Sequence, residues 1–142
     1  MAKLNNSVNI SAPVEKVFAY VSDPMNLPEW MGSMSEVTDL TGSGVGQRYH
    51  WKYNMVGIPL PGESTIKEHV LNQRVVTESK AGIANTFRFT FAPHEGGTKL
   101  DLEVDYTIPV PVLGKLAENL VLKRNQREAV MWMQNIKERL EV

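Results

Sequence analysis

The stretch VLGKLAENLVLKRNQREAVMWMQNIKERLE, residues 112–141, decides the fold, because it predicts one long helix at the end of a chain of strands. After Gly114 it contains no further Gly or Pro, and good helix formers fill it. Its second half carries an apolar stripe at spacings built from three and four, which fall on one helix face. The members of this stripe are Leu122, Ala129, Val130, Met133, Ile136 and Leu140.

The two halves of this helix present different apolar faces. The apolar residues of the first half, Leu113, Leu116, Ala117 and Leu120, fall roughly opposite the stripe, and the intervening residues 123–128 have no apolar side chain. We expect a bent helix packed along a sheet. The alternative is that the first half closes a cavity or meets a partner.

Length and composition favour one soluble domain that spans residues 1–142. A net charge of −1, from 15 basic and 16 acidic residues, indicates no nucleic-acid partner. The absence of cysteine excludes disulfides, thiol catalysis and cysteine metal sites. We expect a cytoplasmic protein, because the sequence shows neither an apolar core of signal-peptide length near residue 1 nor a membrane-spanning run.

Start signals near the N-terminus predict two short helices after a first strand over residues 7–10. Pro13 fits the first turn of a helix because that turn needs no amide hydrogen there, and Glu15 suits its positive end. Asp23-Pro24 repeats the signal and predicts a second, very short helix that reaches Trp30.

Alternation of apolar and polar residues predicts the strands that follow. Tyr49, Trp51, Tyr53 and Met55 alternate with polar residues over 48–55, which is typical of a half-buried antiparallel strand. The best hairpin joins Phe87, Phe89 and Phe91 to Leu100, Leu102, Val104, Tyr106 and Ile108 across the turn at 94–97. In any register that puts these apolar residues on one face, an odd-numbered residue of the first strand pairs with an even-numbered residue of the second. Such a register places Arg88 opposite or diagonal to Glu103 or Asp105.

The order of elements predicts an α+β fold. It consists of a curved antiparallel sheet of six to seven strands, two short helices and the long C-terminal helix. The apolar face of such a sheet must be covered, and only the terminal helix is long enough to cover it.

The sequence resembles the START-like (SRPBCC) superfamily, and most closely its polyketide cyclase/dehydrase-like branch. The resemblance rests on ISAPVEKVF at residues 10–18, VSDP at 21–24, Trp30, GQR at 46–48, GGTKL at 96–100, Gly114 and IKERLE at 136–141. It covers nearly the whole chain and implies the helix-grip fold, with an apolar cavity between the sheet and the long helix. It implies no single function, because members include lipid carriers, plant hormone receptors and aromatase/cyclases.

Large side chains on the predicted inner face are the candidate ligand-binding residues. On the sheet these are Trp51, Tyr53, Met55, Phe87, Phe89 and Tyr106; Trp30 of the second short helix joins them, as do Gln126 and Val130 of the long helix. The alternative is that the aromatic residues form ordinary core. Glu68 is the one acidic residue on the inner face by alternation, which makes it a weak candidate for a polar anchor or a catalytic acid or base. A bulge that turns Glu68 to solvent is the favoured alternative.

Apolar, proline-stiffened connections are the candidate cavity mouth. Their residues are Ile58, Leu60, Pro61, Ile83, Val110, Pro111 and Leu113, and the resemblance places these connections beside the cavity. Apolar loops tend to avoid solvent, so these connections would pack on ligand, on a partner protein or on a membrane surface.

Three functions stay open at this stage. The first is the binding or transport of a hydrophobic small molecule, such as a lipid, a polyketide-like or an aromatic compound. The alternatives are an aromatase/cyclase- or dehydrase-type enzyme and a protein-interaction module, with the protein a monomer or a homodimer. We expect no metal and no cofactor, because His50, His69 and His94 are scattered, with the first two pointing outward by parity.

Overall fold

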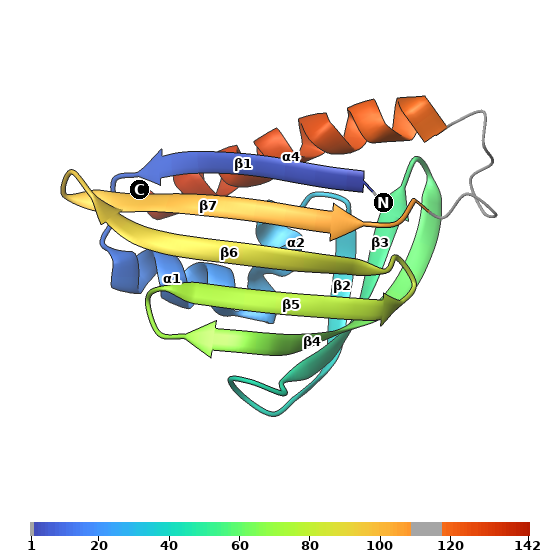
Figure 1. The fold of residues 1–142 in the computed structure, drawn as a ribbon, viewed down its shortest axis with the longest axis horizontal. Coiled ribbons are helices and arrows are strands. Elements are labelled where there is room, and N and C mark those ends of the chain that lie inside the picture. Colours follow the sequence, from blue (N-terminus) through green and yellow to red (C-terminus); the bar gives the residue numbers. More distant parts are fainter. Residues whose placement is uncertain (1, 109–117) are drawn as a thin grey trace.

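The computed structural model describes residues 2–108 and 118–142 and shows a strongly curved antiparallel sheet with helices on one face (Figure 1). The sheet contains seven strands: β1 Ala2–Ile10, β2 Met34–Thr41, β3 Arg48–Met55, β4 Ile58–Val70, β5 Arg74–Ala81, β6 Asn85–His94 and β7 Gly97–Tyr106. The helices are α1 Val14–Ser22, the 3₁₀ turn η1 Pro24–Asn26, α2 Leu27–Trp30 and α4 Glu118–Leu140. This arrangement confirms the predicted α+β helix-grip fold.

The strands lie in the order β1-β7-β6-β5-β4-β3-β2. Each strand from β2 to β7 therefore pairs with its neighbour in the chain, and β1 pairs with β7. The two short helices occupy the connection between the edge strands β1 and β2, while α4 packs on β1, α1 and α2. The sheet and α4 thus enclose the buried side chains between them.

The β6–β7 hairpin has the predicted register. Phe87 pairs with Val104, and Arg88 pairs with Glu103. The Arg88 Nη1 atom lies 2.7 Å from the Oδ2 atom of Asp105, its diagonal neighbour, and this guanidinium holds the pKa of Asp105 below its usual value. This partly exposed ion pair lies on the outer face of the sheet, so the phenylalanine side chains point inward.

The expectation that residues 57–62 form one of the apolar connections is wrong, because residues 58–62 are the first residues of β4 and only Gly57 lies in the turn. The chain turns at Val56 and Gly57, whose φ angles of 52° and 83° are typical of a two-residue hairpin. The two prolines fit the strand, because β5 pairs with β4 only from Glu63 onward. Between β3 and β4, hydrogen-bonded residue pairs alternate with pairs that are not hydrogen-bonded, and both prolines lie in pairs of the second kind. Neither Pro59 nor Pro61 therefore removes a hydrogen bond from the sheet.

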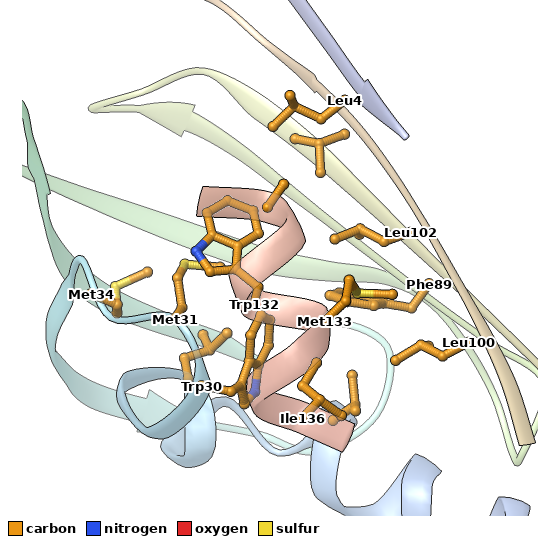
Figure 2. Close-up of a cluster of buried hydrophobic side chains, with 14 of the residues drawn as sticks. Leu4, Trp30, Met31, Met34, Phe89, Leu100, Leu102, Trp132, Met133 and Ile136 are labelled. Carbon is orange, nitrogen blue, oxygen red and sulfur yellow. The ribbon is translucent and has the colours of Figure 1, made fainter. Parts of the chain in front are cut away.

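Helix α4 runs without a break through the polar stretch at residues 123–128. Its buried face differs by about one position from the predicted stripe, since Val130 is 57% exposed and Leu122 is only partly buried. The residues that face the body are Val121, Asn125, Ala129, Trp132, Met133, Ile136 and Leu140. Figure 2 shows Met133 directed towards Phe89 of the sheet, with Ile136 below it and the Trp132 ring turned towards Met31. None of the described helices combines the length and apolar composition needed to cross a membrane.

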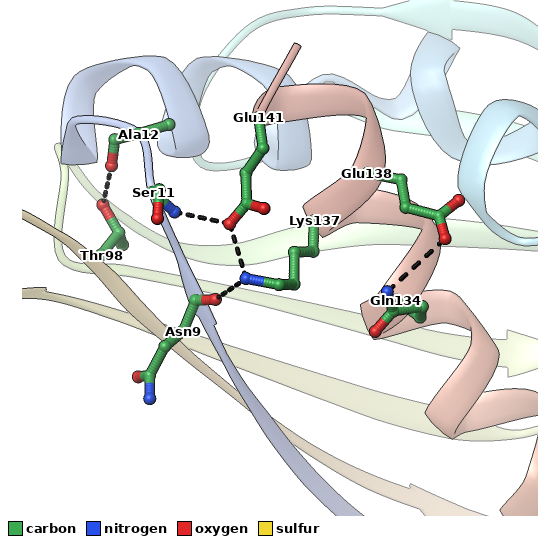
Figure 3. A network of polar contacts seen from close by, with 8 residues as sticks. All are labelled: Asn9, Ser11, Ala12, Thr98, Gln134, Lys137, Glu138 and Glu141. Carbon is green, nitrogen blue, oxygen red and sulfur yellow. Dashed lines mark hydrogen bonds and ion pairs between the residues drawn. The ribbon is translucent and has the colours of Figure 1, made fainter.

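Polar contacts hold the C-terminal end of α4 against the start of the chain (Figure 3). The Lys137 ammonium donates to the backbone oxygen of Asn9 at 2.7 Å and to the Glu141 carboxylate at 2.6 Å. The Glu141 carboxylate also accepts from the backbone amide of Ser11 at 2.8 Å, and these donors lower its pKa. The second half of α4 is therefore fixed both by burial and by these contacts to the end of β1.

Candidate functional site

A cavity lies between the inner face of the sheet and α4, which contributes Asn125 and Trp132 to its wall. Its volume is about 90 Å³, counted as the space that the centre of a water molecule can occupy. On the same measure, one enclosed water needs about 10–15 Å³. All strands from β3 to β7 contribute to its wall, as do the short helical segments and α4. Leaving aside residues 1 and 109–117, no charged side chain lines the cavity.

Strand β3 supplies the largest part of the wall, because its alternation buries every second residue. Tyr49, Trp51, Tyr53 and Met55 all point inward and line the cavity. The indole of Trp51 lies over Gly62, its partner on β4: a Cβ atom added there would come within 2.2 Å of the ring. The Trp51 Nε1 atom donates to the Ser64 hydroxyl at 2.9 Å. A small residue on β4 thus decides how the largest wall side chain lies.

Tyrosine hydroxyls are the most acidic groups on the described wall. Burial raises the pKa of Tyr49 to about 12, and the hydroxyls of Ser64 and Thr77 offset part of that effect. Burial also raises the pKa of Tyr53 and Tyr106. These groups therefore stay neutral and protonated at physiological pH and can orient a ligand by hydrogen bonds without adding a charge.

A polar corner joins α4 to the sheet at one part of the wall. The Asn125 Nδ2 atom donates to the Tyr106 hydroxyl at 3.0 Å, and both residues are nearly fully buried. Asn85 pairs across the sheet with Tyr106 and also lines the cavity. We call Asn85, Tyr106 and Asn125 the polar corner.

A carboxylate lies behind the wall near Tyr53. Glu128 of α4 accepts hydrogen bonds from the Tyr53 hydroxyl at 2.7 Å and from the Ser33 hydroxyl at 2.9 Å. The Nε atom of Arg124 lies 3.4 Å from the same carboxylate, whose side chain is 18% exposed. Glu128 therefore ties α4 to β3 and to the segment before β2, and it reaches the cavity only through Tyr53.

Seven of the predicted site residues line the cavity: Trp51, Tyr53, Met55, Phe87, Phe89, Tyr106 and Ile83. Their role in ligand binding stays a prediction. Residues Val110, Pro111 and Leu113 of the expected mouth lie outside the described residues. The remaining predicted residues do not line the cavity; these are Trp30, Ile58, Leu60, Pro61, Glu68, Gln126 and Val130.

On α4, the expectation that Gln126 and Val130 face the cavity is wrong, since both are exposed. The polar Asn125 lies on the buried face of the helix. A search for apolar residues alone therefore selects the neighbouring face, which carries Val130. Sequence reasoning also missed Trp132, which lines the cavity and packs on Phe87 with ring centroids 6.0 Å apart. A helical line that includes Asn125 and Trp132 at a spacing of seven was the available signal.

Trp30 belongs to the core beside the cavity and not to its wall. It is fully buried, with ring centroids 6.1 Å from Phe89 and 6.4 Å from Trp132. Figure 2 shows it beside Ile136 of α4. Ile58, Leu60 and Pro61, expected at the mouth, lie at the start of β4 and outside the lining of this cavity.

A bulge in β4 between Ile66 and Glu68 changes the expected alternation. Glu68 consequently turns outward, where its carboxylate lies 3.1 Å from the Nε atom of Arg74, and the favoured alternative to an inner-facing acid is confirmed. The prediction that His69 points outward is wrong. Its ring lies edge-on to Phe18 of α1, with centroids 5.3 Å apart. Across the described residues, no group of three or more His, Asp or Glu could hold a metal ion.

Comparison with known proteins assigns the chain to a family. A sequence model of the family described as "Polyketide cyclase / dehydrase and lipid transport" matches residues 1–141. The chain belongs to this family. The match confirms the resemblance to the polyketide cyclase/dehydrase-like branch. No curated protein gave a significant match.

Solved structures of low sequence identity share the fold of this family member. TTHA0849 from Thermus thermophilus is 21% identical, with a TM-score of 0.85, over 98% of this chain and 97% of that one. The Zhui aromatase/cyclase from a Streptomyces species is 12% identical, with a TM-score of 0.78, over 99% and 93%. The Aha1 dimer from Colwellia psychrerythraea is 15% identical, with a TM-score of 0.67, over 100% and 98%. At these identities the likeness shows the fold alone.

Proposed function

We propose that this protein binds a neutral, mostly apolar small molecule in the cavity between the sheet and α4. One observation carries the proposal: the described wall is aromatic and aliphatic, has a few neutral polar groups, and contains no charged side chain. Pockets of this kind gain most of their affinity from burial, while a few polar groups fix the orientation of the ligand. A charged ligand would lose its hydration without finding a counter-ion. The family description, which includes lipid transport, supports the same proposal.

The size of the cavity favours a compact ring compound or a short acyl chain as the ligand. The volume open to water-sized molecules is about 90 Å³, enough for several waters but narrow for a long chain. Phe87, Phe89 and Trp132 provide flat surfaces on which an aromatic ring can stack or meet an edge. We therefore expect molecules of one or two rings to bind more tightly than long acyl chains.

The test is uptake of N-phenyl-1-naphthylamine, a neutral dye that fluoresces in apolar surroundings. The wild type should bind it, and Val104→Phe should lose that binding, because Val104 lines the cavity and the added ring would fill it. Val70→Phe is the matched control, since Val70 is 40% exposed at the end of β4. The circular dichroism of both variants should match that of the wild type. Absence of dye uptake by the folded wild type would refute the proposal.

The contact between Tyr53 and Glu128 favours a second candidate function, an enzyme of the aromatase/cyclase or dehydrase type. The Tyr53 oxygen could accept a proton from a bound ketone while its own proton passes 2.7 Å to the Glu128 carboxylate. Such general base catalysis contributes about 10²–10⁴-fold to a rate. Among the described residues, no other carboxylate accepts a hydrogen bond from a side chain of the wall.

Hydrogen–deuterium exchange at the α-carbon of 2-tetralone, followed by NMR, separates the enzyme from the binding protein. An enzyme should accelerate the exchange, and Glu128→Gln should remove about 10²–10⁴-fold of that acceleration. A binding protein should leave the exchange rate unchanged in both proteins while it still binds the dye. The third hypothesis, a protein-interaction module, would have been favoured by a filled core, and the cavity argues against it.

A further inference from the structure

The polar corner offers one hydrogen-bond donor and one acceptor side by side at the cavity. Asn125 uses its amide hydrogen on the Tyr106 hydroxyl, which leaves its carbonyl oxygen and the hydroxyl hydrogen of Tyr106. Neither of these makes a further hydrogen bond to another described residue, and the one sealed, unpaired polar side-chain atom among those residues is Trp30 Nε1. The Asn125 oxygen is therefore not sealed, and because both Tyr106 and Asn125 line the cavity, we place the free acceptor and donor of the corner on its side.

This conclusion does not depend on how the Asn125 amide is oriented. If its oxygen and nitrogen were exchanged, the oxygen would accept from Tyr106, and the cavity would meet the amide nitrogen as donor and the hydroxyl oxygen as acceptor. Asn85 adds a further amide beside them, with its Nδ2 atom held by the Ile83 backbone oxygen at 2.7 Å. A matched donor and acceptor are thus present in either orientation.

A buried donor–acceptor pair favours ligands that satisfy both of its members. A ligand with only an acceptor leaves the Asn125 oxygen unpaired, which costs about 1–3 kcal/mol in mutational series. A carboxylate brings two acceptors and a charge, and no cation lies on the described wall to compensate it. The preferred group is therefore neutral and carries a donor and an acceptor side by side, both bonded to one carbon atom.

We infer that the polar corner selects ring or acyl ligands that bear such a neutral donor–acceptor group, as in a primary carboxamide or a lactam. This inference rests on the proposed binding function and specifies the ligand class of the same cavity. The apolar body of the ligand would lie against Trp51, Phe87 and Trp132, and the polar group would face Tyr106 and Asn125.

Three naphthalene compounds of nearly equal shape test the inference by competition with the neutral dye. 2-Naphthamide has a donor and an acceptor, 2-acetylnaphthalene has only the acceptor, and 2-isopropenylnaphthalene has neither. The wild type should bind the amide about tenfold or more tightly than the ketone. Asn125→Leu, which preserves side-chain size, should reduce this ratio to about one while dye binding persists. The control Gln126→Leu, on the neighbouring exposed position, should keep the wild-type ratio.

The results distinguish this inference from the function on which it rests. Equal affinity of the wild type for all three compounds would overturn the inference and leave the proposed function standing. Failure of the dye and all three compounds to bind would overturn both. A preference that survives in Asn125→Leu and in Tyr106→Phe would also overturn it. The comparison of compounds on the wild type needs no variant and therefore does not depend on the folding of either substitution.

Discussion

At the scale of single residues, the orientation of the side chains in the cavity wall depends on the hydrogen bonds of their buried polar groups. Trp51 donates to Ser64, Tyr106 accepts from Asn125, and Tyr53 donates to Glu128. These bonds hold the rings in defined orientations, because the loss of one would leave a buried polar atom unpaired. The aromatic residues thus act as oriented surfaces and not only as apolar volume.

The buried hydroxyl of Tyr49 predicts a loss of stability at alkaline pH. Its pKa in the folded protein is about 12, raised from 10.0 by burial. The unfolded chain therefore releases this proton first, so the contribution of Tyr49 is fully present below pH 10 and declines as the pH rises towards 12. The decline should be about 1.4 kcal/mol per pH unit within this window. Denaturant titrations at pH 9, 10 and 11 should show a shallower decline for Tyr49→Phe, and identical slopes would contradict the assignment.

Gly62 should control the position of Trp51. Gly62→Ala should displace the indole, because the added methyl would lie 2.2 Å from a ring atom, and should weaken the bond from Trp51 to Ser64. We expect a destabilisation of about 1–3 kcal/mol from this overpacking, with reduced dye uptake. Gly32→Ala is the control, since no atom lies within 4 Å of its added Cβ. Denaturant titration and tryptophan fluorescence measure both effects, and equal behaviour of the two variants would refute the role of Gly62.

At the scale of elements, α4 and β4 show how a regular pattern can be shifted by one residue. In α4 the buried line passes through Asn125, whose polarity hides it from a hydrophobicity count. In β4 the bulge after Ile66 turns Glu68 outward and brings His69 to Phe18. In both elements the contacts made with neighbouring elements decide the face.

Two methionines on α4 test the assigned face of the helix. Met133 is 3% exposed, whereas Met131 is 61% exposed. Met133→Ala should lower the free energy of unfolding by about 2–5 kcal/mol, because burial is lost and a cavity remains. Met131→Ala should change it by less than about 0.5 kcal/mol, since its side chain meets solvent. Urea titration of the two variants gives the comparison, and similar losses would show that the helix face is assigned wrongly.

At the scale of the whole molecule, the fold separates a fixed part from a cavity. The C-terminal half of α4 is buried against the sheet and held by Lys137 and Glu141, whereas its N-terminal half borders the cavity at Asn125. The curvature of the sheet keeps the two walls apart there, and the side chains of α4 do not fill the space. A ligand in the cavity would therefore bridge the sheet and the helix.

Ligand binding should accordingly stabilise the whole protein. A compound that binds only the folded state raises the free energy of unfolding by about 2.7 kcal/mol at a concentration one hundred times its Kd. We expect 2-naphthamide to raise the melting temperature of the wild type in a concentration-dependent way, measured by calorimetry. The cavity-filled variant Val104→Phe should show no such rise. A rise of equal size in both proteins would indicate binding elsewhere on the surface.

The sequence by itself determined the fold class and most of the inner face of the sheet. The alternation over residues 48–55 and in the β6–β7 hairpin predicted the inward-facing aromatic residues, and parity alone placed Arg88 opposite or diagonal to Glu103 or Asp105, as the structure has it. These patterns succeed because the period of a strand is two and one face is buried, so that an error of one residue would expose every apolar side chain.

Only the tertiary structure decided which of these residues border a cavity and which polar groups serve them. The hydrophobicity of a helix changes only gradually from one face to the next. One buried polar residue, Asn125, is therefore enough to shift the apparent apolar stripe towards Val130 and Gln126. A bulge leaves no clear mark in the sequence, because it depends on how β4 pairs with β5. The contact of Tyr53 with Glu128 joins residues 75 positions apart, and no local pattern specifies such a contact, because it arises only when α4 closes over the curved sheet.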